Sequence, residues 1–306
     1  MARYIFGRVL GMIPILVIVS ILSFLFVHLT PGDPIRIMYG ADMDMTTYAN
    51  LKEKLGFNDP LYVQYGRYIS QILTGDFGVS FKTKTNVSEE IGRRLLYTLG
   101  LTFASMFWAL VIGLIVGIYS AAKRKSLWDR IGIISTTTII SIPEFWFGLM
   151  LMQVFAVKLG WLPTSGSGTF AHLLLPSITL GFGVAAIIAR FTRSSVLEVL
   201  QEDFVRTARA KGQRESIIIW THVLRNALIP VITMTGLQFG FLLGGAVVVE
   251  QVFSWPGLGS YLIDSVLARD YPAMQALILL FSVQFLIINL VVDISYSLVN
   301  PQIRYE

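Results

Sequence analysis

The chain has 306 residues, of which 54% are hydrophobic and 14% charged, and its mean hydropathy is +0.67. A chain of this composition cannot keep its apolar surface inside a water-soluble globule, so we expect an integral membrane protein. The sequence contains no cysteine, which excludes a disulfide framework and a thiolate metal site, and its net charge of +5 gives no separate support for nucleic-acid binding.

Six apolar stretches are long enough to cross a bilayer as helices, which satisfy every backbone hydrogen bond within their own segment. In chain order they are residues 9–29, 97–122, 131–157, 173–189, 227–249 and 273–292. The first is longer than the apolar core of a signal peptide, and no small-x-small cleavage site follows it, so we expect it to be retained. The sequence therefore predicts an all-α protein with six transmembrane helices.

The distribution of Lys and Arg predicts the orientation, because basic residues in short loops are retained in the cytoplasm. With the N-terminus inside, the short inner segments are basic, whereas the two short outer loops carry only Lys158 and Arg269. Both termini are then cytoplasmic. We expect a single transmembrane domain over residues 1–306, with an extracytoplasmic segment at 30–96 and a cytoplasmic loop at 190–226.

The extracytoplasmic segment has a helical pattern of its own. Apolar and aromatic residues recur at helical spacing over 61–72, between Pro60 and Gly75, which predicts an amphipathic helix on the outer face. Asn86 with Glu89 three residues later is typical of a capping pair that opens a helix leading into the second span. The pattern favours packing of the first helix against the protein's own surface over docking of a partner.

Small residues at four-residue spacing mark faces where helix backbones approach closely. The stripes are Gly113 and Gly117 in the second span, Gly181, Ala185 and Ala189 in the fourth, and Gly236, Gly240 and Gly244 in the fifth. Packing within the subunit and packing against another subunit both fit these stripes.

A short basic helix is predicted inside the cytoplasmic loop. Asp203 suits the start of a helix, and Gly212 can supply the left-handed turn that ends it. Phe204, Val205 and Ala208 share one face, and we expect Phe204 and Val205 to be exposed, where they can enter a separate soluble partner. Charge alone also fits a basic face resting on membrane lipid. The segment consists of Asp203, Phe204, Val205, Arg206, Thr207, Ala208, Arg209, Ala210, Lys211 and Gly212.

Two stretches of this loop resemble the coupling loop of permease subunits of ATP-binding-cassette (ABC) importers. They are Arg-Thr-Ala-Arg-Ala-Lys-Gly at 206–212 and His-Val-Leu-Arg-Asn-Ala-Leu-Ile-Pro at 222–230. The general family pattern has Glu-Ala-Ala in place of residues 206–208 and a proline near Arg225. The peptide-importer branch shows the same departure as this chain.

Motifs along the whole chain carry the same resemblance. They are Thr-Pro-Gly-Asp-Pro at 30–34, Thr-Gly-Asp-Phe-Gly at 74–78, Ser-Ile-Pro at 141–143 followed by Phe145, Leu-Gly-Trp-Leu-Pro at 159–163, Gly-Leu-Gln-Phe-Gly at 236–240, Val-Phe-Ser-Trp-Pro-Gly-Leu-Gly at 252–259 and Arg-Asp-Tyr-Pro at 269–272. Their order and spacing are similar to the first permease subunit of dipeptide and glutathione importers.

This resemblance implies the type I permease fold of ABC importers, in the bacterial cytoplasmic (inner) membrane, with a coupling helix between the fourth and fifth spans. It implies a second homologous permease subunit, two cytoplasmic ATP-binding subunits that hold ATP and Mg, and an extracytoplasmic substrate-binding protein. The implied function is ATP-driven import of small peptides (dipeptide, oligopeptide or glutathione-like) by alternating access. Similar permeases carry nickel and other metal chelates, so the cargo stays open.

The chain itself carries no sign of catalysis. It lacks the G-x-x-x-x-G-K-[ST] loop, so we expect ATP hydrolysis in partner subunits and no cofactor on this chain. His28, His172 and His222 are not spaced as metal ligands, and no nucleophile and base are grouped, so neither a metal site nor a catalytic residue is expected. A secondary transporter is the alternative from another class, although the two halves show no evident inverted repeat.

Glu144 is expected near the bilayer midplane, where an acidic side chain is costly unless it faces protein or water. We expect it to line the transport pathway, for which Gln153 and Gln238 are further candidates. Its carboxylate could meet the ammonium group of a peptide. Alternatively it could be neutral and bonded to backbone freed by Pro143, an interpretation that the neighbouring proline favours.

The outer mouth of the pathway is expected where Pro and Gly interrupt the apolar pattern after the fifth span. An outer gate or the docking of a binding protein would need such irregular backbone, although a plain turn explains the same residues. The candidates are Asp33, Glu250, Trp255, Pro256 and Gly257.

Overall fold

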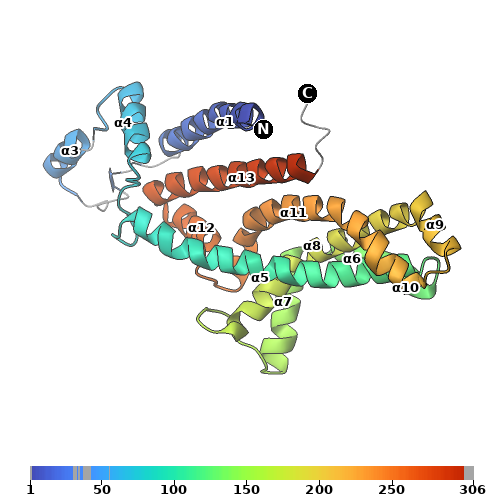
Figure 1. Ribbon diagram of the computed structural model, residues 1–306. Helices are drawn as coiled ribbons and strands as arrows, with labels where there is room; N and C mark the ends of the chain where they lie inside the picture. Colours follow the sequence, from blue (N-terminus) through green and yellow to red (C-terminus); the bar gives the residue numbers. More distant parts are fainter. Residues whose placement is uncertain (1, 30–32, 34, 37–42, 55, 300–306) are drawn as a thin grey trace. The chain divides into compact units, whose positions relative to one another are not determined.

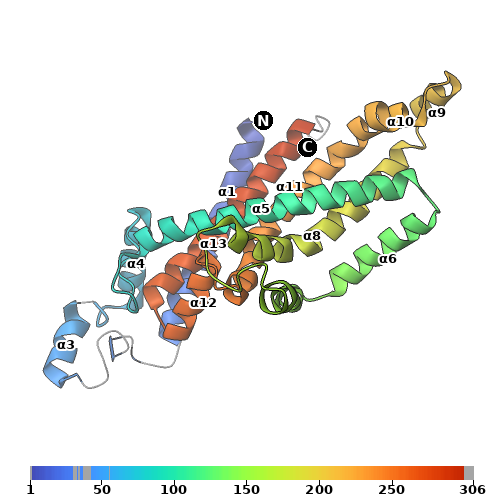
Figure 2. The same cartoon turned by 90° about the horizontal axis from the view of Figure 1, so that it is seen from below.

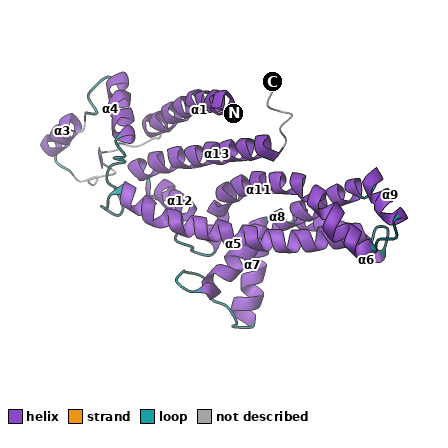
Figure 3. Cartoon of the chain, in the orientation of Figure 1, coloured by secondary structure: helices purple, strands orange, loops and turns teal. Residues whose placement is uncertain are grey.

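The computed structural model describes the chain outside residues 1, 30–32, 34, 37–42, 55 and 300–306. The described residues are mainly helical, with one isolated antiparallel bridge between Val79 and Asn86 (Figure 1 and, by secondary structure, Figure 3). The helices are α1 (Ala2–Leu29), α3 (Met45–Lys54), α4 (Leu61–Leu73), α5 (Val87–Ala122), α6 (Leu127–Ser141), α7 (Glu144–Leu151), α8 (Phe170–Val199), α9 (Asp203–Ala210), α10 (Glu215–Ile217), α11 (Leu224–Val252), α12 (Leu258–Ala268) and α13 (Tyr271–Val299), with π-helices η1 (Met152–Lys158) and η2 (Ile218–Val223).

Five helices of the described chain are long and apolar enough to cross a membrane, or six if one bent pair forms a single span. The third span, expected over 131–157, is not one continuous helix. The helix α6 ends at Ser141, and the helical stretch from Glu144 to Lys158, formed by α7 and η1, is bent from it by 102° (Figure 2). Pro143 is the physical reason, since proline has no N–H for the helix ladder and disfavours helical geometry at the residue before it. The fourth span is longer than expected, because α8 continues through Arg190 to Val199.

The chain divides into two compact units, one formed by residues 1–97 and 257–287 and the other by 98–256 and 288–306. In the first unit, the predicted helix over 61–72 is confirmed as α4, and it packs on α1. The hydroxyl groups of Tyr65 and Ser20 form a hydrogen bond of 2.8 Å. The Tyr65 ring contacts the Phe24 ring edge-on, with ring centroids 5.5 Å apart. Packing against the protein's own surface, the favoured interpretation, is therefore the observed one.

Asn86 caps the helix leading into the second span, as predicted, although the hydrogen bond joins it to Ser88 and not to the predicted partner Glu89. Asn86 Oδ1 accepts a hydrogen bond of 2.9 Å from the Ser88 amide, directly before α5 begins at Val87. The first turn then packs into the core of this unit, where Val87 and Ile91 lie against Leu258 and Leu277. The cap thus sets where α5 begins, and the apolar face behind it holds the helix to α12 and α13.

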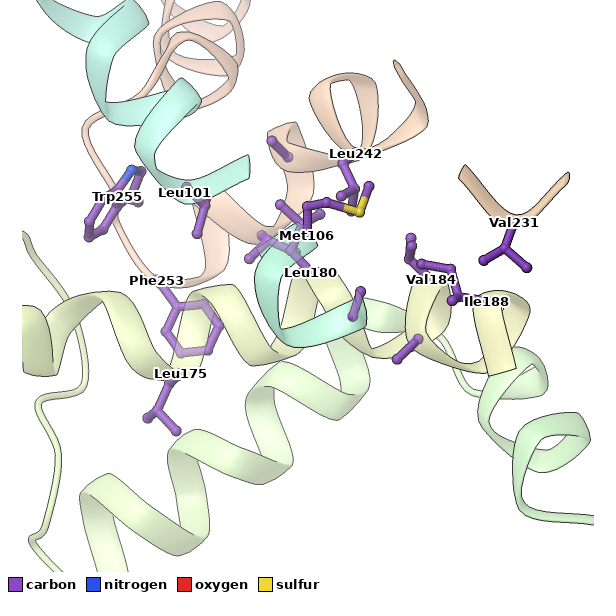
Figure 4. Packing of buried hydrophobic residues seen from close by; sticks show 14 residues of the cluster. Leu101, Met106, Leu175, Leu180, Val184, Ile188, Val231, Leu242, Phe253 and Trp255 are labelled. Atoms are coloured by element: carbon purple, nitrogen blue, oxygen red, sulfur yellow. The ribbon is translucent and has the colours of Figure 1, made fainter. Parts of the chain in front are cut away.

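In the second unit, α8 packs against α6, α7 and α11. Its core contains Leu101 and Met106 from α5, Leu180 and Ile188 from α8, and Leu242 from α11 (Figure 4). The small residues of the second and fourth spans bring helices together within the subunit, whereas Gly244 of the fifth span has no neighbouring atom within 4 Å of a built Cβ. A Cβ atom on Gly117 would lie 2.6 Å from the carbonyl oxygen of Ala189, and one on Gly181 would lie 2.5 Å from that of Ser105.

An ion pair that sequence reasoning did not single out ties α6 to α8. Arg193 donates two hydrogen bonds to Asp129, from Nε to Oδ1 at 2.6 Å and from Nη2 to Oδ2 at 2.9 Å, and Ser120 of α5 donates a third at 2.6 Å. Asp129 is only 3% exposed. Three helices therefore meet at one buried carboxylate, and each of its oxygens has a charged donor.

Candidate functional site

The segment predicted to couple to an ATPase folds as the two-turn helix α9, at the far end of α8 (Figures 1 and 2). Val205 and Ala208 are buried and pack against Ile218 and Val223 of η2. The expectation that Val205 is exposed is therefore wrong, because it anchors the helix to the chain that follows. Phe204 on the neighbouring face is 42% exposed, as expected.

The start of α9 differs from the prediction. Glu202 occupies the N-cap position without a side-chain hydrogen bond, and Asp203 is the first helical residue, so Asp203 is not the cap. The main-chain carbonyl of Glu202 already accepts hydrogen bonds from the amides of Val205 and Arg206. Asp203 instead forms a pair with Arg206 at 3.3 Å, and both side chains are largely exposed.

The end of α9 confirms the prediction for Gly212. Its φ is +74°, in the left-handed region that glycine adopts without strain. The Gly212 amide donates to the carbonyl of Arg209 at 2.9 Å, and the Gln213 amide donates to that of Ala208 at 3.3 Å. These two bonds form a Schellman ending, which satisfies carbonyls that the last helical turn would leave open.

A second set of contacts fastens α9 to the root of the next long helix. Arg209 donates to Glu215 from Nη2 at 2.5 Å and from Nε at 3.1 Å. The side chains of Gln213 and His222 meet at 3.0 Å. From Glu215 the chain continues as one apolar helical stretch to Val252. The short helix is thus connected to a long helix through a buried contact, an ion pair and a side-chain hydrogen bond.

Two of the three pathway candidates line one cavity, of about 310 Å³. Glu144 is the first residue of α7, and Gln238 comes from α11 and is only 5% exposed. Gln153 lies in η1, is exposed, and is not among the lining residues. The cavity is lined by Ile139, Ile140, Ile142, Glu144, Leu180, Gly183, Val184, Ile187, Gln238, Phe241, Leu242 and Gly245.

Close packing between α7 and α8 fixes the position of Glu144. Phe147 stacks on Phe182 with centroids 3.7 Å apart, and a Cβ atom on Gly148 would lie 2.9 Å from Cγ2 of Thr179. Two glycines leave room around the carboxylate, because a Cβ on Gly183 would lie 3.6 Å from its Oε1 and one on Gly245 would lie 3.9 Å from its Oε2. Within the described residues Glu144 has no hydrogen-bond or ion-pair partner, so no bond to backbone near Pro143 is present there.

Two candidates for the outer mouth are buried. Glu250 is 0% exposed and its Oε1 accepts a hydrogen bond from the Thr98 hydroxyl at 2.7 Å, while Trp255 is 6% exposed and packs in the core with Leu101 (Figure 4). The predicted helix break is confirmed, since α11 ends at Val252 and α12 begins at Leu258, with Gly257 at the N-cap position and Pro256 before it. A gating or docking role for these residues stays a prediction.

Asp33 is engaged in local structure; the rest of its motif, at 30–32 and 34, lies outside the described residues. Its carboxylate accepts hydrogen bonds from the Ile35 amide at 2.9 Å and from the Tyr48 hydroxyl at 2.5 Å. Burial acts to raise the pKa of Asp33, but these hydrogen bonds outweigh it and the pKa lies below its usual value. No group of three or more metal-ligating side chains is present in the part of the chain that is described.

Comparison with known proteins gives consistent matches along the whole chain. A family model described as "Binding-protein-dependent transport system inner membrane component" matches residues 113–305, and a companion model for the N-terminal part of such components matches residues 1–102. The chain is 54% identical to a glutathione transport system permease protein GsiC of Salmonella paratyphi A and 52% identical to that of Escherichia coli strain K12, each over 306 residues and 100% of both chains.

Solved structures share the fold at lower identity. A chain of the MetNI methionine ABC transporter, in an inward facing conformation, matches with a TM-score of 0.59 and 22% identity, covering 69% of this chain and 96% of that one. An amino acid ABC transporter chain matches with a TM-score of 0.53 and 17% identity, covering 69% and 94%.

Proposed function

Because this chain belongs to the family of binding-protein-dependent transport system inner membrane components, we propose that it conducts small peptides into the cell as one permease of an ATP-driven importer. The chain is a multi-pass permease subunit of an ABC importer in the cytoplasmic membrane.

A glutathione-like peptide is the cargo that the comparisons favour. The full-length relatives at 52–54% identity are named as glutathione transport permeases. We therefore expect an extracytoplasmic binding protein that delivers glutathione or a similar small peptide. A nickel or other metal chelate is the competing cargo within the same family.

The attachment of α9 is the observation that carries the proposed mechanism. Its buried Val205 and the ion pair between Arg209 and Glu215 join it to η2 and α11, while Phe204 and Arg206 remain open to a partner. An ATPase that binds Phe204 and Arg206 would therefore displace α11 along with α9. In this mechanism two ATP-binding subunits, which hold ATP and Mg, close around α9 of this chain and around the matching helix of a second permease.

The free energy needed to switch between the inward and outward states also favours a partner ATPase. Inverting a 1:99 population of inward and outward states to 99:1 requires about 5.5 kcal/mol of differential binding. A weakly held small peptide supplies little of this, because only the difference in its affinity for the two states counts. ATP binding and hydrolysis in partner subunits can supply it.

The test is assembly and transport with defined components. The tagged chain, purified from its native membrane, should carry a second permease and two ATPase subunits with it. In proteoliposomes, the complete complex with the glutathione-loaded binding protein should hydrolyse ATP and accumulate glutathione, and this chain alone should not. Uphill transport by the chain alone would refute the proposal, and stimulation only by a metal chelate would refute its cargo.

A further inference from the structure

The cavity beside Glu144 combines an acidic group with apolar walls. Gln238 is the other polar side chain that lines it, and no Lys, Arg or His is among its lining residues. Glu144 has no hydrogen-bond or ion-pair partner within the described parts of the chain. An ionised carboxylate in apolar surroundings is unfavourable unless a cation or hydrogen-bond donors accompany it. The cavity therefore favours a ligand that brings a positive charge.

The break between α6 and α7 adds to this preference. Ile139, Ile140 and Ile142, at the C-terminal end of α6, line the same cavity. The last carbonyls of a helix lack intrahelical partners and carry the negative end of its dipole. The positive end of α7 lies at the same break, but Glu144 is its first residue and offsets it. The carbonyl end of α6 and the carboxylate of Glu144 therefore both favour a cation over an anion at this break.

We propose that this cavity binds a primary ammonium group of the cargo, with the carboxylate of Glu144 as its charge partner and the amide oxygen of Gln238 as a second acceptor. A volume of about 310 Å³ is at the lower end for a ligand site, so it accepts the amino-terminal part of a peptide and not the whole molecule. Gly183 and Gly245 keep that space open beside the carboxylate. The inference rests on the proposed function and adds a requirement for a free amino group at a site inside the permease.

Transport in proteoliposomes holding the complete importer tests the charge pair. Glutathione and N-acetylglutathione are compared at subsaturating concentration for the wild type and for Glu144→Gln. The binding protein prefers one cargo over the other equally with both permeases. Its preference therefore cancels when the uptake ratio of the two cargoes in Glu144→Gln is divided by that ratio in the wild type. We expect Glu144→Gln to lower glutathione uptake at least about 10-fold and to change N-acetylglutathione uptake less than about 2-fold. Equal losses for both cargoes would overturn the proposal.

Further variants distinguish a defect in cargo binding at Glu144 from a defect in assembly or ATP hydrolysis. Glu144→Asp keeps the charge and should retain uptake within about 3-fold. Glu53→Gln, the same substitution at an exposed residue of α3 outside the cavity, should leave uptake unchanged. ATP hydrolysis stimulated by the loaded binding protein should persist in Glu144→Gln. Loss of stimulated hydrolysis in the wild type would count against the proposed function and not against this site.

A direct occupancy measurement does not depend on transport. In the purified complex, an apolar carbodiimide should label Glu144, as read by mass spectrometry. Labelling is counted as the sum of the N-acylurea on Glu144 and any amide that the added amine forms with the activated carboxyl. L-Alaninamide should slow this total at least about 3-fold, and N-acetyl-L-alaninamide should not. Equal protection by both compounds, or protection by neither, would overturn the proposal.

Discussion

Replacement of Gly212 tests whether the ending of α9 matters for coupling. Its φ of +74° is unfavourable for a residue with a side chain, and valine is worse than most because its Cβ is branched. A Cβ at this position would meet no other atom within 4 Å, so the penalty comes from the backbone alone. That penalty is about 1–2 kcal/mol, which lowers the population of the intact helix end roughly 5- to 30-fold.

Gly212→Val should therefore lower the number of glutathione molecules imported per ATP hydrolysed, while the protein still inserts and assembles. The assay is simultaneous measurement of uptake and phosphate release in proteoliposomes. Gly212→Asn is the matched control, because asparagine tolerates the left-handed region and should keep a ratio near that of the wild type. If the valine and asparagine variants lose coupling equally, or if valine loses none, the reasoning from backbone strain is refuted.

Three other substitutions have expected outcomes. Val205→Ala should destabilise the attachment of α9 by about 2 kcal/mol, because less apolar surface is buried against η2. The amides of α9 should then exchange hydrogen faster, and unchanged exchange would count against Val205 as the residue that holds α9 in place. Arg193→Ala should lower the stability of the detergent-solubilised complex by about 3 kcal/mol in a thermal melt, because it leaves Asp129 buried without its cation. Adding Asp129→Asn should recover part of this loss. A double variant that is less stable than Arg193→Ala would contradict the reasoning. Thr98→Val should cost about 1.5 kcal/mol in the same melting assay, because the buried Glu250 loses a donor, and an unchanged midpoint would argue against that hydrogen bond.

Periodicity and turn residues predicted the parts of this fold that depend on local sequence. The helix over 61–72, the cap at Asn86 and the left-handed Gly212 are examples, and the structure confirms each. These features follow from the conformational preferences of a few neighbouring residues. Such preferences do not require knowledge of the rest of the chain.

Features that depend on distant partners were predicted less well. Hydropathy does not predict the bend within the apolar run over 131–157. It is summed over residues and takes no account of the missing N–H of Pro143. The local pattern does not predict the burial of Val205, because the side chains that cover it belong to η2, more than ten residues further along the chain. The pairing of Asp129 with Arg193 joins positions far apart in the chain, and Glu144 and Gln238 likewise share a cavity only through the packing of α7, α8 and α11.

The glycine contacts between α5 and α8 limit how the second unit can change shape. At Gly117 and Gly181 the two backbones are so near that any side chain would collide with a carbonyl oxygen of the opposite helix. If α5 slid along α8 by one residue, bulkier side chains would replace the glycines at these contacts. We therefore expect the two helices to move together as one rigid unit. The ladder of main-chain hydrogen bonds is interrupted at Ile142 and Pro143, between α6 and α7, so we expect a change of shape to occur there before it occurs between α5 and α8.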